Sequence, residues 1–279
     1  MKWTYPYQAV VLLSGLLIVG CAPGRASGPD SKPARQVVVV ELFTSEGCSS
    51  CPPADALLKE LSETQPVAGA QVLALEEHVD YWNQLGWADP FSSNQYSLRQ
   101  SQYATFFKGS GVYTPQMVVD GAKEFVGSRG REARATIEEA ARQIKTPIGL
   151  KEVSAAPAGF TAIQIAIPAS AAAGKQGEVW LAVTESNLHS DVKAGENSGE
   201  TLQHAPVVRE LRKLRDFHTE DGASLQSSIE LDKKWKRENV AVVVFLAEKR
   251  TGKIFGASLL KLEGQSGKPG SQALTTGKR

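Results

Sequence analysis

The feature that most constrains this chain is a pair of cysteines placed directly after a strand-like segment. Residues 36–43 form a nearly continuous run of β-branched and apolar residues, which is typical of a strand buried on both faces of a sheet. Cys48 and Cys51 follow in the sequence Cys-Ser-Ser-Cys. Apolar residues at helical spacing then predict a short helix over residues 55–61, and residues 71–75 predict a second buried strand. This order is a β-α-β unit.

The next part of the chain continues to alternate between helix and strand. Residues 92–107 are polar and aromatic and predict a helix. Residues 116–119 and 123–126 are two short strand-like runs about an Asp-Gly dipeptide, a strong hairpin signal. Ser128 is then expected to cap a helix whose apolar face carries Ala133, Ile137, Ala140, Ala141 and Ile144. The predicted order of this part is β-α-β-α-β-β-α.

After residue 147 the pattern changes to short strands with little helix between them. The segments that show it are residues 149–153, 160–167, 178–184, 227–231, 240–248 and 253–260. Such a series predicts a β-sandwich of about seven strands with immunoglobulin-like architecture. Nearby, His189 and His204 are expected to be solvated loop residues. The predicted fold is thus an α/β domain over residues 36–146 followed by an all-β sandwich domain over residues 147–262.

The N-terminus carries an apolar run, residues 9–19, that is too short to cross a bilayer, which needs about 20 apolar residues. Its length suits a secretory signal peptide. The sequence Ile-Val-Gly-Cys that ends at Cys21 resembles the lipobox of bacterial lipoproteins, in which the cysteine is acylated and becomes the mature N-terminus. An ordinary signal peptide cleaved near Ala22 or Ala26 is the alternative interpretation.

On the lipoprotein interpretation, residues 1–20 are removed, residues 21–35 form a flexible tether, and residues 263–279 form a disordered tail. The lipid would anchor the protein in the bacterial cell envelope, facing the periplasm, and is its only expected contact with a membrane. Ala22 in place of a retaining aspartate resembles lipoproteins sorted to the outer membrane. The net charge is +1, so no nucleic-acid partner is implied.

Cysteine counting leaves a single pair. Of three cysteines, acylation of Cys21 leaves Cys48 and Cys51 in a compartment where disulfides persist. Their spacing allows a disulfide, but a bond that closes so short a loop adds little entropic stabilisation. Three uses of the pair remain open: a redox centre, a metal clamp and an inert disulfide.

Two longer stretches carry a resemblance to a known family. The stretches are ELFTSEGCSSCPPAD around the cysteine pair and HVDYWNQLGWADPF over residues 78–91. In this order they resemble the bacterial family known as domain of unknown function 1223 (DUF1223), a thioredoxin-like family of exported proteins. The resemblance covers most of the chain after the tether. It implies a thioredoxin-like fold for residues 36–146, without the additional N-terminal strand and helix of thioredoxin.

The thioredoxin resemblance also implies roles for three residues. Pro115 matches the proline whose peptide bond is cis and which faces the cysteine pair, so Thr114 is expected to contact the substrate. Glu41 lies near the position of a buried acid that exchanges protons with the second cysteine. From sequence alone, the alternatives are an ordinary proline that begins a strand and an exposed carboxylate at a strand end.

The expected chemistry is thiol–disulfide exchange. Cys48 at a helix N-terminus would be the nucleophile, and Cys51 would resolve the mixed disulfide. Two prolines after Cys51 put the start of that helix in doubt, because proline is comfortable only in a first turn. Gly47 stands where thioredoxin has a tryptophan, so Trp82 or Trp87 would supply the substrate platform.

His78 has two interpretations. It could stabilise the Cys48 thiolate or supply a third metal ligand, or it could simply pack the loop that follows the second strand. The leading functional hypothesis is an envelope thiol–disulfide oxidoreductase acting on protein or small thiol substrates, recharged by an unknown redox partner, with no cofactor and no metal. The alternatives are a Cu(I) delivery protein that uses the two thiolates, and a non-catalytic thioredoxin-like binding module.

Overall fold

The computed structural model describes residues 1–3, 35–109, 111–153, 157, 159–169 and 176–264. Pro33–Arg279 is one compact unit, separate from Met1–Lys32, and the fold below is that of the larger unit. Most of the predicted signal peptide, Cys21 and nearly all of the tether lie outside the described residues, as does most of the predicted tail. Among the described residues, no helix combines the length and apolar character needed to span a membrane.

Most of the described strands join one mixed sheet of eight strands in the order β13-β12-β7-β10-β2-β1-β3-β4. Its strands are β1 (Gln36–Thr44), β2 (Ala70–His78), β3 (Gln116–Val119), β4 (Lys123–Val126), β7 (Gln176–Glu185), β10 (Val207–His218), β12 (Val240–Glu248) and β13 (Ile254–Lys261). β2 runs parallel to both β1 and β10, and the other neighbouring pairs are antiparallel.

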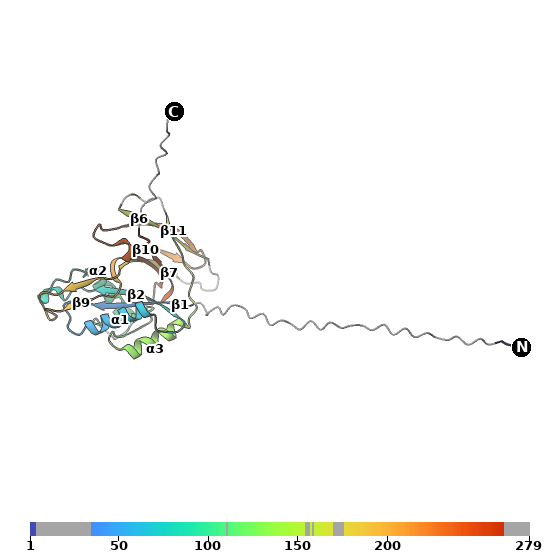
Figure 1. The fold of residues 1–279 in the computed structure, drawn as a ribbon, viewed down its shortest axis with the longest axis horizontal. Helices are drawn as coiled ribbons and strands as arrows, with labels where there is room; N and C mark the ends of the chain where they lie inside the picture. The colour runs from blue at the N-terminus through green and yellow to red at the C-terminus, as the bar shows by residue number, and fades with distance from the viewer. Residues whose placement is uncertain (4–34, 110, 154–156, 158, 170–175, 265–279) are drawn as a thin grey trace, which may run out of the picture. The chain divides into compact units, whose positions relative to one another are not determined.

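The remaining strands form two smaller antiparallel sheets. One has the order β11-β6-β5, and the other pairs β8 with β9. These strands are β5 (Gly149–Val153), β6 (Phe160–Ile167), β8 (His189–Asp191), β9 (Thr201–Gln203) and β11 (Ala223–Glu230). The helices are α1 (Pro52–Thr64), α2 (Asn94–Phe106) and α3 (Gly130–Ala141), with single 3-10 turns at Asn83–Leu85 and Arg237–Asn239. Figure 1 shows α1 and α3 below β1 and β2, and β6 and β11 above β7 and β10.

Alternation along β1 explains how the helices are placed. Val38, Val40 and Leu42 are fully buried in one cluster with residues of α1 and α3, so both helices cover this face. Val39 points to the other face, where it packs in a cluster with Tyr96 of α2. Because both faces are covered, β1 is a nearly continuous apolar run, interrupted by Glu41, instead of an alternating one.

The large sheet curls so that its two ends approach each other. Val39 and Leu73 share one buried cluster with Phe245 and Ile254, which come from the other end of the sheet. The backbone amide of Ile254 donates a hydrogen bond of 2.7 Å to the carbonyl of Asp120, in the turn between β3 and β4. One apolar core therefore serves strands from both halves of the chain.

The two halves of the sheet meet at a very short ladder. In the parallel pairing of β10 with β2, the only registered residue pair is Val207 with Glu76. The amide of Glu76 also donates to the carbonyl of Pro206 at 3.0 Å. Few backbone hydrogen bonds therefore join β2 to β10, and side-chain contacts must contribute much of the interaction between the two halves of the sheet.

The predicted elements agree closely with this structure, and the main difference concerns the sandwich. Strands that were expected to form a separate sandwich, such as β7 and β12, instead extend the sheet of the α/β part. A two-layer packing does occur, because β6 and β11 bury Ile163, Ile165 and Ile229 against β7 and β12. One layer of the predicted sandwich is therefore shared with the sheet that carries the cysteine site.

Two details of α3 differ from the sequence prediction. Ser128 is not its cap, because the helix begins after Arg129, whose side chain makes no capping hydrogen bond. Ala133 and Ile137 are buried as predicted, but the helix ends at Ala141. Ile144 therefore lies beyond the helix and is almost fully exposed, at 94%.

Replacing Gly121 by alanine is expected to destabilise the protein more than replacing Gly69. Both glycines have positive φ, 57° and 76°, so each alanine costs about 1–2 kcal/mol of backbone strain. A Cβ at Gly121 would also lie 2.1 Å from the backbone carbonyl oxygen of Gly252, whereas nothing lies within 4 Å at Gly69. Urea unfolding should show a further loss of about 1–3 kcal/mol for G121A. Equal losses for both variants would contradict this close approach.

Candidate functional site

A disulfide joins Cys48 and Cys51 in the turn that leads from β1 into α1, with Cα atoms 5.4 Å apart. The helix begins at Pro52, with Cys51 as its N-cap, so Cys48 lies outside the helix instead of at its start. The two prolines occupy the first helical positions, where a missing amide hydrogen has no consequence. Both cysteines are completely buried.

Thr114 and Trp82 lie beside Cys48, as the sequence predicts. The Thr114 hydroxyl donates to Cys48 Sγ at 3.3 Å and accepts from Trp82 Nε1 at 2.9 Å. The Thr114–Pro115 peptide bond is cis, which confirms that prediction, and Pro115 is buried directly before β3. Ser50 Oγ is also 3.3 Å from Cys48 Sγ, and it must be the donor because a disulfide sulfur carries no hydrogen.

A segment from the C-terminal half of the chain holds the cysteine turn in place. The side-chain amide of Asn197 donates to the backbone carbonyls of Glu46, at 2.8 Å, and of Cys48, at 3.0 Å. Glu196 accepts a hydrogen bond of 3.0 Å from the amide of Ser49. These contacts connect the segment between β8 and β9 to both sides of Cys48, so the turn is clamped by residues far away in sequence.

Glu41 is buried, but it lies in a different environment from the one predicted. It points to the face of β1 that also carries Val39, opposite the face covered by α1. Its carboxylate binds the Arg99 guanidinium and the Tyr103 hydroxyl. None of the hydrogen bonds seen for Glu41 in the described part of the chain reaches a cysteine, so its predicted proton-transfer role gains no support.

Asp55 is the buried acid on the same side as the cysteines. It lies four residues after Cys51 along helical backbone, a spacing that places both side chains on one face. It accepts a hydrogen bond of 2.6 Å from the Thr44 hydroxyl at the end of β1. Burial, with a contribution from the nearby Glu76 carboxylate, raises the pKa of Asp55 to about 8.

His78 belongs to a buried polar cluster at the end of β2. Its Nδ1 lies 2.7 Å from Asp89 Oδ2, and its Nε2 lies 3.1 Å from Glu76 Oε1. Burial opposes protonation, but Asp89 and Glu76 outweigh it and raise the pKa of His78 well above its usual value. Both ring nitrogens are thus engaged by carboxylates, and His78 supplies neither of the predicted interactions with the cysteine pair.

His204 completes the same cluster from the other half of the chain. It is 98% buried, so the prediction that it is a solvated loop residue is wrong; His189 is exposed as predicted. His204 Nδ1 lies 3.1 Å from Glu76 Oε1, and its Nε2 lies 3.3 Å from Glu46 Oε1. Burial opposes protonation of His204, but Glu46 and Glu76 raise its pKa to about 9.

The cluster connects back to the cysteine turn through Glu46. The amide of Glu46 donates to Asp89 Oδ2 at 2.8 Å, and its Oε2 accepts from Trp87 Nε1 at 2.7 Å. Burial would raise the pKa of Asp89, but its interactions with His78 and two backbone amides lower it. Glu46 lies two residues before Cys48, so the polar cluster and the disulfide share one loop.

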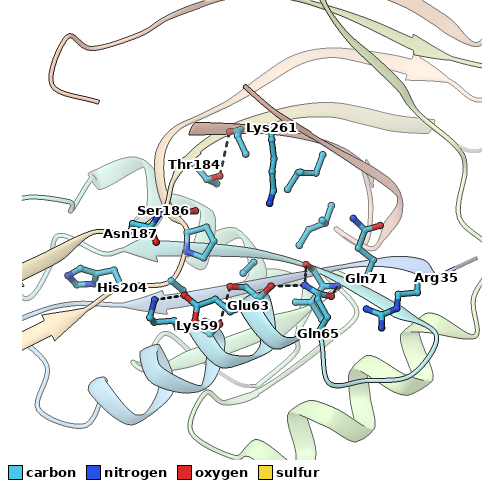
Figure 2. A pocket seen from close by; sticks show the side chains of 18 residues that line it. Arg35, Lys59, Glu63, Gln65, Gln71, Thr184, Ser186, Asn187, His204 and Lys261 are labelled. Carbon is cyan, nitrogen blue, oxygen red and sulfur yellow. Dashed lines mark hydrogen bonds and ion pairs between the residues drawn. The ribbon is translucent and has the colours of Figure 1, made fainter. Parts of the chain in front are cut away.

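A groove of about 570 Å³ has His204 among its lining residues (Figure 2). Lys59 and Glu63 of α1 line one wall, and Thr184 and Lys261 line the other. Figure 2 shows the His204 ring at one end of this groove. The groove therefore borders one residue of the buried cluster, and neither cysteine lines it.

The structure brings together Cys48, Cys51, Thr114, Pro115 and Trp82 but separates Glu41 and His78 from them. Sequence reasoning missed the following residues of the site: Glu46, Asp55, Glu76, Asp89, Asn197 and His204. Glu46 and Asp55 lie within the first quoted stretch, and Asp89 lies within the second, so proximity to those stretches was an available signal. Nothing local marked Asn197 or His204, which are far away in sequence.

The fold and this site define a mixed α/β protein with a buried Cys-x-x-Cys disulfide beside a cluster of histidines and carboxylates. The family described as protein of unknown function (DUF1223) matches residues 39–247, most of the chain. The chain belongs to this family, which confirms the family resemblance seen in the sequence.

Solved structures with a similar fold support the architecture. A crystal structure of a protein from Agrobacterium tumefaciens matches with a TM-score of 0.61 and 28% identity, covering 81% of this chain and 96% of that one. HBP35 of Porphyromonas gingivalis matches with a TM-score of 0.59 and 15% identity, covering 88% of this chain and 81% of that one. At the latter identity the likeness concerns the fold alone. No curated protein matches the chain.

The raised pKa of Asp55 predicts a pH-dependent stability difference between the wild type and D55N. Because the folded-state pKa of about 8 lies above the ordinary value of 3.8, protonation of Asp55 favours folding, and this contribution is lost as pH rises between those values. Asparagine does not titrate, so the free energy of unfolding of D55N should rise relative to that of the wild type by on the order of 1 kcal/mol per pH unit between about pH 4 and 8.

Urea unfolding at several pH values measures this difference. D221N, at an exposed aspartate, is the matched control and should follow the wild type. A D55N difference that stays constant over this pH range would contradict the prediction.

Proposed function

We propose that this protein is a thiol–disulfide oxidoreductase of the bacterial cell envelope and that its α/β part is thioredoxin-like. The observation that carries the proposal is the contact of the Thr114 hydroxyl with Cys48 Sγ, directly before a cis-proline. That contact places the residue before the cis-proline against one sulfur of a Cys-x-x-Cys disulfide. The element order β1-α1-β2-α2-β3-β4-α3 supports the thioredoxin-like assignment.

The proposed reaction transfers two electrons from a substrate dithiol to the disulfide. A substrate thiolate attacks Cys48 Sγ, the Cys48–Cys51 bond breaks, and Cys51 leaves as a thiolate that takes up a proton. The second substrate thiol loses its proton and attacks the substrate sulfur of the mixed disulfide. The substrate leaves as a disulfide and both cysteines are reduced; an oxidised protein disulfide then restores the pair by the reverse steps.

Cys48 is the sulfur assigned to attack substrates because of its hydrogen-bond donors. The hydroxyls of Thr114 and Ser50 both donate to its Sγ, and such bonds stabilise a thiolate more than a neutral sulfur. Cys51 follows Cys48 in the turn and is the N-cap of α1. Asp55, one helical turn after Cys51, is the acid placed to exchange a proton with it.

Complete burial of both cysteines means that exchange requires the turn to open. Ser49 and Ser50 are exposed, so the turn itself reaches the surface while its sulfurs face inward. The Asn197 amide holds the backbone on both sides of Gly47. We therefore assign the segment around Asn197 as the part that must move before a substrate can reach Cys48.

The Cu(I) carrier is less well supported than exchange chemistry. That alternative required His78 as a third ligand beside the two thiolates, but the ring nitrogens of His78 contact Asp89 and Glu76 and not the sulfur of either cysteine. The cell-envelope location and outer-membrane lipid anchor at Cys21 remain part of the proposal and rest on the N-terminal sequence alone.

Cysteine variants test the proposal directly. Oxidised full-length protein, titrated with glutathione and analysed by thiol labelling and peptide mapping of Cys48 and Cys51, should show a reversible two-electron transition between roughly −120 and −270 mV. C51A should accumulate a mixed disulfide with a disulfide-containing protein, whereas C48A should not. The reason is that Thr114, the expected substrate contact, bonds Cys48 Sγ. A pair that resists reduction far below that range would overturn the oxidoreductase assignment.

Loss of the Asn197 amide should make the disulfide more accessible. N197A removes both bonds to the cysteine turn, so its disulfide should be reduced by dithiothreitol several-fold faster than that of the wild type. N94A, at an exposed asparagine of α2, is the control and should leave the rate unchanged. An unaltered rate in folded N197A would contradict the gating role of this segment.

A further inference from the structure

Thiol exchange does not use the polar cluster formed by Glu76, His78 and His204, and this cluster has the composition of a metal site. One potential ligand atom from each of the three residues lies within 4.8 Å of the other two. All three side chains are at least 98% buried. Glu76 and His78 end β2, and His204 comes from the segment between β9 and β10, so both halves of the chain contribute.

The distances between these atoms suit ligands that share one small cation. Glu76 Oε1 lies 3.1 Å from His78 Nε2 and 3.1 Å from His204 Nδ1. Ligands about 2.0–2.2 Å from a tetrahedral zinc ion are separated by comparable distances. Two imidazole nitrogens and a carboxylate oxygen also form a common ligand set for zinc.

Each histidine is oriented by a carboxylate on its other nitrogen. Asp89 Oδ2 lies 2.7 Å from His78 Nδ1, and Glu46 Oε1 lies 3.3 Å from His204 Nε2. The second nitrogen of a metal-binding histidine almost always contacts a carboxylate, a backbone carbonyl or water, and this contact fixes the tautomer and the ring orientation. Asp89 is itself fixed by the amides of Glu46 and Phe91. The arrangement therefore includes the second layer of residues that metal sites require.

The cluster also contains buried polar atoms that the described residues do not satisfy. Glu76 Oε2 lacks a hydrogen-bond partner among those residues, and Glu46 Oε1 and His204 Nε2 form an ion pair at 3.3 Å without hydrogen-bond geometry. A buried carboxylate oxygen without a partner is costly, and a cation bound to the Glu76 carboxylate would offset that cost. The unsatisfied Glu76 oxygen is an observation independent of the ligand spacing, and it also points to a cation.

We propose that Glu76, His78 and His204 bind one divalent transition-metal ion of the zinc class. Ca²⁺ and Mg²⁺ prefer oxygen ligands and fit two imidazoles poorly. Cu(I) prefers thiolates, and the two sulfurs of this region are in a disulfide and do not take part in the cluster. The three protein ligands leave a fourth tetrahedral position for water.

The groove shown in Figure 2 supplies an entry path for the ion. His204 lines one end of the groove, although its ring is almost fully buried. An ion entering there would reach the His204 end of the cluster without passing the disulfide. Once bound, it would join β2 to the segment that precedes β10, where the backbone ladder is shortest.

Zinc binding by full-length protein with its disulfide intact tests the proposal. After treatment with a chelator, addition of Zn²⁺ and gel filtration, mass spectrometry for metals should find one zinc per chain, and zinc should raise the unfolding temperature. H204Q should bind zinc more than about 100-fold more weakly, as judged by competition with a chromophoric chelator. H189A, at an exposed histidine, is the matched control and should bind zinc like the wild type.

Two further variants keep the result decisive. If circular dichroism shows that H204Q does not fold, E76Q takes its place, because it removes the ligand charge and keeps the side-chain shape. A double C48A/C51A variant should still bind one zinc, which separates this site from the thiols and makes the result independent of the proposed exchange reaction. Wild-type protein that retains no zinc, or folded E76Q and H204Q that bind it as tightly as the wild type, would overturn the proposal.

Discussion

The carboxylate of Glu76, shared between two histidines, is the interaction on which the rest of the site depends. Burial of a charged group is costly unless opposite charge and hydrogen bonds compensate for it, and breaking such a buried pair typically costs about 3–5 kcal/mol. Glu76 is completely buried, and Oε1 faces both His78 and His204. Burial would raise the pKa of Glu76, but these histidines lower it overall. Both halves of the chain therefore help to keep the buried Glu76 carboxylate charged.

The shared carboxylate explains how the site keeps a fixed geometry although β2 and β10 pair only briefly along the backbone. β2 and β10 share a single registered pair, so the backbone does little to align the two halves there. The histidine–carboxylate contacts cross between the same two halves and extend through Glu46 to the cysteine turn. Asn197 adds a second crossing. The cysteine turn is thus held by residues that lie outside the α/β part of the chain.

Much of the fold follows from local sequence pattern. The hairpin strands β3 and β4 match their predicted bounds, because an Asp-Gly turn fixes the register of short flanking strands. The predicted separate sandwich did not follow, because periodicity indicates which residues form strands but not which sheet they join. The strand β7 pairs with β12 and β10, and β10 then pairs with β2; such long-range pairing has no local signal.

The site shows the same division between local and distant information. Cys48, Thr114 and the cis-Pro115 could be found because a resemblance assigned them to known positions. Glu41 was misplaced because an offset of one residue along a strand moves a side chain to the opposite face. His204 was taken for a solvated residue because its polar surroundings gave no sign that it pairs with Glu76, 128 positions away.

The clamp on the cysteine turn has a consequence for the order in which the protein matures. Chains emerge N-terminus first, so Cys48 and Cys51 are synthesised long before Asn197 and His204. Until those residues emerge, the turn has neither its amide clamp nor its histidine neighbour. Both cysteines are therefore present in the growing chain before the residues that clamp and bury their turn.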